Sequence, residues 1–251
     1  MIRLSPDLDV QALATAFAAN RRRLHIPGIL DADSAEAVGG VLEAETQWKA
    51  TVAAGGTFLE LPLNGRVAAD PAKQAWLDEA AVDGTNPLIQ YIFDTRRLTA
   101  DRELGLARGD AADGTLDFLN SKAFIGFARA VTGDDRIDFA DAQASRYRPG
   151  HVLMAHTDAS AGKNRVYGYV LNFSRGWRAD WGGHLVFYGP DGHVEGGWVP
   201  AFNALNLFAV PTPHAVTQVA TFAPQDRLSI VGWLRSNSPV GPQAKSETSA
   251  Y

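Results

Sequence analysis

The chain has 251 residues, a length that suits one large domain or two small ones. Hydrophobic residues make up 46% of it and charged residues 20%, as in a globular protein with a sizeable core. A net charge of −5 without a basic stripe argues against a nucleic-acid-binding surface. The absence of cysteine excludes disulfides and thiolate metal sites and fits a cytoplasmic protein. With no long apolar stretch and no secretory signal at the start, we expect no membrane association.

Helical periodicity dominates the first 140 residues. Asp33 and Glu36 resemble a capping box, and the apolar residues that follow them on one face predict a helix over 33–46. The stretch 117–132 has the clearest helical pattern, and Gly133 is a natural stop after it. This part of the chain is therefore expected to supply a helical layer.

Two further segments of the first half are less regular. Residues 48–61 predict a strand that Gly55-Gly56 interrupts. Residues 83–116 are rich in Asp, Gly, Arg and Thr. They predict a long irregular excursion with about one helical turn, which could form a lid or rim over a site.

Short strand-like segments separated by turn signals follow from residue 140 on. The predicted strands are 142–148, 166–173, 183–188, 193–199, 204–210, 215–219 and 228–234. Seven or eight short strands at this spacing predict a sandwich or jelly roll, with the helices on one outer face. We expect one α+β domain over 1–235, helical up to 140 and a jelly roll from about 141. The polar segment 236–251 is expected to be a disordered tail.

Two histidines and one aspartate suggest a metal site in the strand-rich half. His156 and Asp158 are two residues apart, so on a strand both side chains point the same way. His214 comes after 55 intervening residues, at the start of another predicted strand. Alone, the first two could be a chance pair on a surface strand and His214 a buried, hydrogen-bonded histidine. Together they match the facial triad of non-haem Fe(II) oxygenases, which leaves one face of the metal open.

Arg227 opens the run Arg-Leu-Ser-Ile-Val-Gly-Trp-Leu, thirteen residues after His214. Its apolar neighbours favour a buried position over a surface one, and a buried guanidinium needs a partner. Its fixed fork of donors would suit a dicarboxylate. The glycine pair Gly182-Gly183 indicates either a close backbone approach near a site or an ordinary irregularity at a sheet edge.

Six blocks of this half resemble the prolyl-4-hydroxylase-like branch of the 2-oxoglutarate/Fe(II)-dependent dioxygenases. They are Ser145–Asp158, Tyr169–Phe173, Trp181–Phe187, Phe202–Phe208, His214–Val216 and Arg227–Trp233. The blocks span about 145–235, over a third of the chain, and their order and spacing are specific for the superfamily. The resemblance implies a double-stranded β-helix, which is a jelly roll, with helices before it.

The resemblance also implies roles for individual residues. Fe(II) would bind His156, Asp158 and His214, and the distal carboxylate of 2-oxoglutarate would pair with Arg227. Tyr147 matches the tyrosine whose hydroxyl contacts the cosubstrate, although a packing aromatic is the alternative. Two residues of the next predicted strand, Tyr169 and Asn172, are candidates for the pocket wall. They fall on opposite faces, so we do not expect both, and we assign Tyr169 to the cosubstrate.

The implied activity is a dioxygenase that uses Fe(II), 2-oxoglutarate and O₂, with ascorbate as a reductant. It would hydroxylate an unactivated C–H bond, with a prolyl residue of a peptide or protein as the first choice of substrate. A free amino acid or small metabolite is the alternative substrate. A cupin-like module that binds a metal or ligand without oxidation, and a sensor of 2-oxoglutarate that recruits a partner, are rival functions. A complete ligand set together with Arg227 favours catalysis, because a pure binder needs no open metal face.

Overall fold

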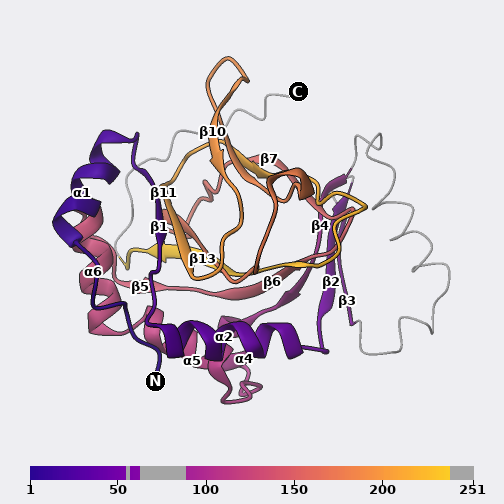
Figure 1. The fold of residues 1–251 in the computed structure, drawn as a ribbon, viewed down its shortest axis with the longest axis horizontal. Coiled ribbons are helices and arrows are strands. Elements are labelled where there is room, and N and C mark those ends of the chain that lie inside the picture. Colours follow the sequence, from indigo (N-terminus) through magenta and orange to yellow (C-terminus); the bar gives the residue numbers. More distant parts are fainter. Residues whose placement is uncertain (55–56, 63–88, 238–251) are drawn as a thin grey trace.

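A computed structural model describes residues 1–54, 57–62 and 89–237, and thirteen strands in these ranges form one antiparallel sheet. The sheet curls into the near-barrel of a jelly roll (Figure 1). The strands are β1 (Arg23–Pro27), β2 (Lys49–Ala54), β3 (Thr57–Pro62), β4 (Ile89–Arg96), β5 (Phe139–Ala140), β6 (Gln143–Tyr147), β7 (Val152–His156), β8 (Arg165–Asn172), β9 (Leu185–Tyr188), β10 (Val194–Trp198), β11 (Ala204–Ala209), β12 (His214–Val216) and β13 (Arg227–Arg235). The jelly roll predicted from the spacing of the strands is confirmed.

The order of strands brings distant parts of the chain together. Along the sheet it runs β1-β11-β8-β13-β6-β4-β7-β12-β9-β10. Strand β4 pairs with β6 over 94–96 and with β7 over 91–92, so the chain from β6 to β7 bends while it stays beside one strand. This bend carries β7 away from β13 and places it next to β12, which pairs with β9 on its other side. The cavity described below lies between these two parts of the sheet.

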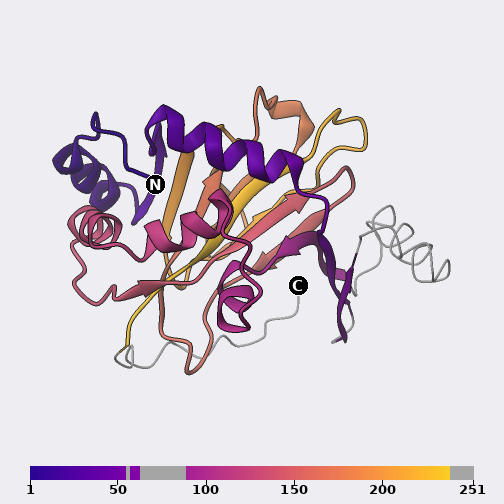
Figure 2. The ribbon, with the colours of Figure 1, turned by 90° about the horizontal axis from the view of Figure 1, so that it is seen from below.

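Helices cover one outer face of the sheet, as predicted (Figure 2). They are α1 (Val10–Ala19), α2 (Ala32–Ala44), α4 (Leu98–Glu103), α5 (Ala111–Leu119) and α6 (Lys122–Thr132), with a short 3₁₀ turn, η2 (Ala179–Trp181). A large apolar cluster joins them to the sheet, and it includes Phe17, Trp48, Phe124 and Leu171, all nearly inaccessible to solvent. Within the described ranges, no helix is both long enough and apolar enough to cross a membrane.

Two expected helix boundaries were wrong. The cap of α2 is Asp31, whose carboxylate accepts a hydrogen bond from the Ser34 N–H, and not the Asp33–Glu36 pair. The predicted helix over 117–132 is two helices, because Ser121 accepts a hydrogen bond from the Phe124 N–H and so begins α6 anew. The apolar face that we predicted for α6 is buried as expected.

The expectation of a long irregular excursion over 83–116 was also wrong. From residue 89 on, this segment forms β4, α4 and α5; residues 83–88 lie outside the described residues. Charged residues on β4 concealed the strand. Arg96 is buried against Asp110 and Asp113 of the α5 region, and Asp94 is buried against two arginines of the neighbouring strand region.

The remaining expectations concern segments at the edges of the described ranges. The strand expected over 48–61 is the hairpin of β2 and β3, and the Gly55-Gly56 pair between them lies outside the described residues. Of the tail expected to be disordered, residues 238–251 also lie outside them.

Candidate metal centre

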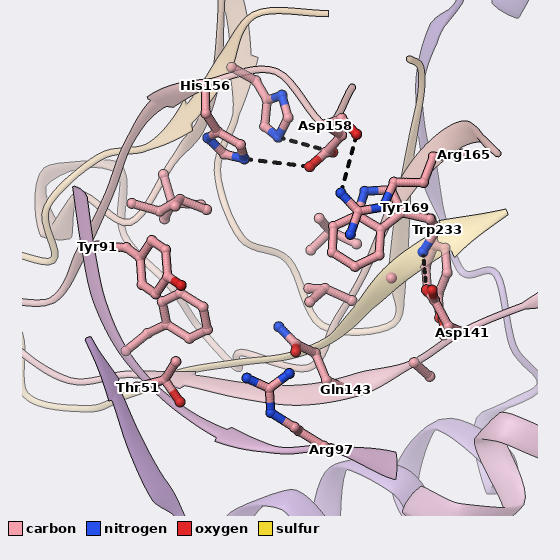
Figure 3. Close-up of a pocket in the computed structure, with 18 of the residues that line it drawn as sticks. Thr51, Tyr91, Arg97, Asp141, Gln143, His156, Asp158, Arg165, Tyr169 and Trp233 are labelled. Carbon is pink, nitrogen blue, oxygen red and sulfur yellow. Dashed lines mark hydrogen bonds and ion pairs between the residues drawn. The ribbon is translucent and has the colours of Figure 1, made fainter. Parts of the chain in front are cut away.

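The three predicted metal ligands converge on one point. His156 ends β7 and His214 begins β12, and the two residues face each other directly across the antiparallel pair. The Nε2 atoms of His156 and His214 lie 3.6 and 3.5 Å from the two carboxylate oxygens of Asp158. One ligand atom from each residue fits within 4.8 Å of the others, and among the described residues this is the one cluster of its kind. Figure 3 shows His156 and Asp158 pointing at each other from the cavity wall.

Backbone carbonyls orient both imidazoles. The Nδ1 atom of His156 lies 2.9 Å from the Met154 carbonyl oxygen, and that of His214 lies 2.8 Å from the Thr212 carbonyl oxygen. Because a carbonyl can only accept, each Nδ1 carries the proton and donates it. Each Nε2 therefore presents its lone pair to the shared point, which is how ligating histidines are usually held.

The charges of the three side chains also suit a cation. Burial, followed by the neighbouring His156, lowers the pKa of His214 to about 4, so its ring is neutral at pH 7. Burial alone would raise the pKa of Asp158, but the neighbouring His156 and His214 hold it below its usual value. The cluster thus offers an ionised carboxylate and at least one neutral imidazole, the donor set of a divalent metal site.

A cavity of about 750 Å³ opens beside the triad. Arg227, Tyr147 and Tyr169 line it together with the three candidate ligands. All three of these predicted cosubstrate residues are almost completely buried, at 1%, 3% and 1% exposure. The structure therefore gathers every predicted site residue around a single cavity.

Arg227 is a buried cation without a carboxylate partner among the described residues. Its Nε has no hydrogen-bond partner there, and its Nη1 lies 3.5 Å from the Ser229 hydroxyl, at the limit of a hydrogen bond. The guanidinium carbon lies 5.0 Å from the centre of the Tyr147 ring, on the residue directly opposite in β6. Burial lowers the pKa of Arg227, so its charged form is held at a cost that an anionic ligand would offset.

A row of buried polar side chains lies beside Arg227; Asn172 was a candidate from the sequence, whereas Ser145 and Ser229 were missed. Ser145, Ser229 and Asn172 face one another across β6, β13 and β8. Residues directly opposite in a sheet share a face, and Ser229 is two residues from Arg227, so all point to the same side. Among the described residues, the Ser145 hydroxyl and the Asn172 amide oxygen have no hydrogen-bond partner. Within the described ranges, these orphaned buried atoms lie next to a guanidinium that has no carboxylate partner, and together they fit a bound polar anion.

Tyr169 and Asn172 differ in what their polar ends do. Tyr169 contributes to the cavity wall, but its hydroxyl donates a hydrogen bond of 2.7 Å to the Asp141 carbonyl. Asn172 leaves its amide oxygen without a partner among the described residues, in the row beside Arg227. The alternation of side chains along a strand correctly predicted that the two residues lie on opposite faces. Which of them lies on the face of Arg227 is set by the register of β8 against β13.

The glycine pair Gly182-Gly183 is a close backbone approach. Both residues have left-handed backbone angles, with φ of 66° and 65°. A Cβ on Gly182 would lie 2.0 Å from the Gln218 carbonyl oxygen, and one on Gly183 would lie 3.1 Å from Cδ of Arg227. Glycine at 183 therefore leaves space for the arginine side chain.

Comparison with known families agrees with this geometry. Residues 142–235 match the model of the 2OG-Fe(II) oxygenase superfamily. The match covers the jelly-roll part of the chain, which is therefore similar to this superfamily. The cofactors predicted from the sequence, Fe(II) with 2-oxoglutarate and O₂ as cosubstrates, are those of this superfamily, and the triad could bind the iron. No curated protein sequence matches the chain.

Solved structures confirm the fold of the chain. A Pseudomonas putida prolyl-4-hydroxylase superposes with a TM-score of 0.58 at 18% identity, over 91% of this chain and 100% of that one. A 2OG-Fe(II) oxygenase family protein from Burkholderia pseudomallei gives 0.59 at 14% identity, over 92% of both chains. A prolyl hydroxylase from Trichoplax adhaerens, solved with a hypoxia inducible factor peptide, gives 0.58 at 17% identity, over 90% and 89%. At these identities the likeness shows the double-stranded β-helix fold.

Proposed function

We propose that the chain is a 2-oxoglutarate-dependent dioxygenase that hydroxylates an unactivated C–H bond, with a prolyl residue of a peptide or protein as its substrate. The observation that carries the proposal is the convergence on one cavity of the three candidate ligands and a buried arginine that has no carboxylate partner among the described residues. We also propose that residues 1–235 form a single catalytic domain. The apolar cluster that joins the helices to the sheet supports this.

His156, Asp158 and His214 are the proposed ligands of Fe(II). Their carbonyl-bound Nδ1 atoms fix both rings, so the metal site is preorganised and only the Nε2 atoms are available. When bound, iron and 2-oxoglutarate supply the oxidising chemistry: O₂ is consumed, one oxygen atom enters the C–H bond, and the other enters succinate as CO₂ leaves. Three protein ligands leave the rest of the metal sphere for the cosubstrates.

Arg227 is the proposed partner of the distal carboxylate of 2-oxoglutarate. A planar fork matches a carboxylate with two parallel hydrogen bonds, and burial strengthens them because water does not compete. Tyr147, directly opposite Arg227, and the row of Ser145, Ser229 and Asn172 supply further polar atoms at the same place. Burial raises the pKa of the Tyr147 hydroxyl, so that group stays protonated and can donate a hydrogen bond.

A flat surface at the cavity supports a prolyl substrate. The Arg165 guanidinium stacks over the Trp233 ring at 3.4 Å, and both residues line the cavity. Arg165 also donates a hydrogen bond of 3.2 Å to the Asp158 carbonyl oxygen, which ties this surface to a proposed metal ligand (Figure 3). A pyrrolidine ring could lie against it with a C–H bond directed towards the triad. The prolyl hydroxylases with the same fold add support.

Succinate formation tests the proposal. Purified protein is assayed with Fe(II), ascorbate, 2-oxoglutarate and prolyl peptides, wild type against Asp158→Ala. We expect succinate and a gain of one oxygen atom on a prolyl residue in the wild type, and neither in the variant. A gain on a free amino acid or metabolite in place of the peptide would give the alternative substrate class, and equal turnover in both proteins would remove Asp158 from the site.

A further inference from the structure

A line of side chains on β4 and just beyond it faces the cavity. The residues of β4 alternate, so every second one points inward. Tyr91 and Phe93 line the cavity, the Thr95 hydroxyl contacts Thr51, which also lines it, and Arg97 lines it just beyond the end of the strand. Two of the intervening residues, Asp94 and Arg96, point outward, where they are paired with other charges.

Arg97 comes to lie beside Gln143 of β6. Arg96 is paired with Ala144, so the next position along the same register sets Arg97 opposite Gln143. Figure 3 shows the Arg97 guanidinium and the Gln143 amide pointing into the cavity, across from His156 and Asp158. Neither residue belongs to the proposed metal or 2-oxoglutarate site.

A carboxylate on β3 fixes the direction of this guanidinium. The Arg97 Nε donates a hydrogen bond of 2.8 Å to Glu60, and the Arg97 side chain is 37% exposed. The positive charge of Arg97 also acts on the nearby Tyr91 hydroxyl, opposing the rise in pKa that burial causes there. This end of the cavity therefore holds an oriented cation at a wall that is open to solvent.

We infer that Arg97, together with Gln143, binds a carboxylate of the primary substrate, so that preferred substrates are acidic. This inference rests on the proposed function. A guanidinium fork beside an amide donor matches a carboxylate, and the charge-assisted hydrogen bonds would hold it against the wall. Arg97 and the triad line the same cavity, so a substrate whose carboxylate is held at Arg97 would extend through that cavity towards the triad. The carboxylate is either the α-carboxylate of a free amino acid or chain end, or an acidic side chain next to the reacting residue.

Binding of matched acid and amide probes tests the inference. The full chain is loaded with Mn(II) in place of Fe(II) and with 2-oxoglutarate, and the affinity of two probe pairs is measured by calorimetry. One pair is L-proline and L-prolinamide; the other is acetyl-Ala-Pro-Glu-amide and acetyl-Ala-Pro-Gln-amide. We expect the acid of one pair to bind about 10- to 100-fold more tightly than its amide, the size of a charge-assisted contact. The pair that shows the preference identifies the source of the carboxylate.

Variants distinguish a direct contact between Arg97 and the probe carboxylate from a general effect of the protein's charge. Arg97→Gln should abolish the preference, and Arg97→Lys should retain part of it. The matched control Arg102→Gln removes the same charge from an exposed pair with Asp117 and should keep the preference in full. Equal affinities for acid and amide in the wild type, including no binding of either, would overturn the inference, as would a preference that survives in Arg97→Gln.

Wild-type turnover distinguishes failure of this inference from failure of the proposed function. If succinate forms with Fe(II) and any probe, but the acid probes are not preferred over the amides, only the role of Arg97 is refuted. No succinate with any probe or without one would count against the proposed function itself.

Discussion

Replacing Arg227 with methionine should have opposite effects on the free and the ligand-bound protein. The guanidinium is 1% exposed and has no acidic partner among the described residues, so it is a desolvated charge in the free protein. An apolar side chain of similar volume at such a site is neutral or stabilises by up to about 4 kcal/mol. For a domain of this size, each kcal/mol corresponds to about 2–4 °C in Tm. We therefore expect Arg227→Met to melt at or above the wild-type Tm without ligand.

The variant should lose its response to 2-oxoglutarate. Two charge-assisted hydrogen bonds of about 1.5–3 kcal/mol each would be lost, which weakens binding by roughly 10²- to 10⁴-fold. With Mn(II) and 2-oxoglutarate at 100 times the wild-type Kd, the wild type should gain about 2.7 kcal/mol and the variant almost nothing. Scanning calorimetry measures both effects, with Arg102→Met as the exposed control. The reasoning would be refuted if Arg227→Met melts below the wild type and 2-oxoglutarate still raises its Tm as much as it raises that of the wild type.

Two further predictions concern residues around the site. Gly183→Ala should raise the KM for 2-oxoglutarate while iron binding is retained, because the new Cβ would press on the Arg227 side chain. The control is Gly192→Ala: Gly192 also has a positive φ, but a Cβ there would meet no atom within 4 Å. Equal kinetics in the two variants would show that the contact is unimportant. Burial lowers the pKa of His151 to about 4, below its value in an unfolded chain, so stability should be full above about pH 6.5 and fall by about 3 kcal/mol towards pH 4. Denaturant unfolding across this range should show a smaller fall in His151→Phe, and an identical fall would remove His151 as its cause.

The parts of the site that could be predicted from sequence depend on local geometry. His156 and Asp158 share a strand face because they are two residues apart, and His214 stands at a strand start after a proline turn. Arg227 was predicted to be buried because its neighbours are apolar, and it is. Period, spacing and immediate neighbours are all visible in a sequence.

The parts that could not be predicted depend on register between distant strands. Ser145, Ser229 and Asn172 form a row only because β13 aligns with both β6 and β8, and no local pattern fixes that alignment. Strand β4 was hidden for another reason. Its outward residues Asp94 and Arg96 are charged, which is typical of a solvated loop. In the structure both are buried, because residues of the flanking elements form ion pairs with them.

An anaerobic titration with Fe(II) and 2-oxoglutarate tests the central claim most directly. If His156, Asp158 and His214 hold one iron beside the cosubstrate site, the wild type should develop a weak visible charge-transfer band that needs both components and saturates at one iron per chain. The band should be absent in Asp158→Ala under the same conditions. A wild type without the band, or an Asp158→Ala variant that develops it with the same affinity, would contradict the assignment of these three residues.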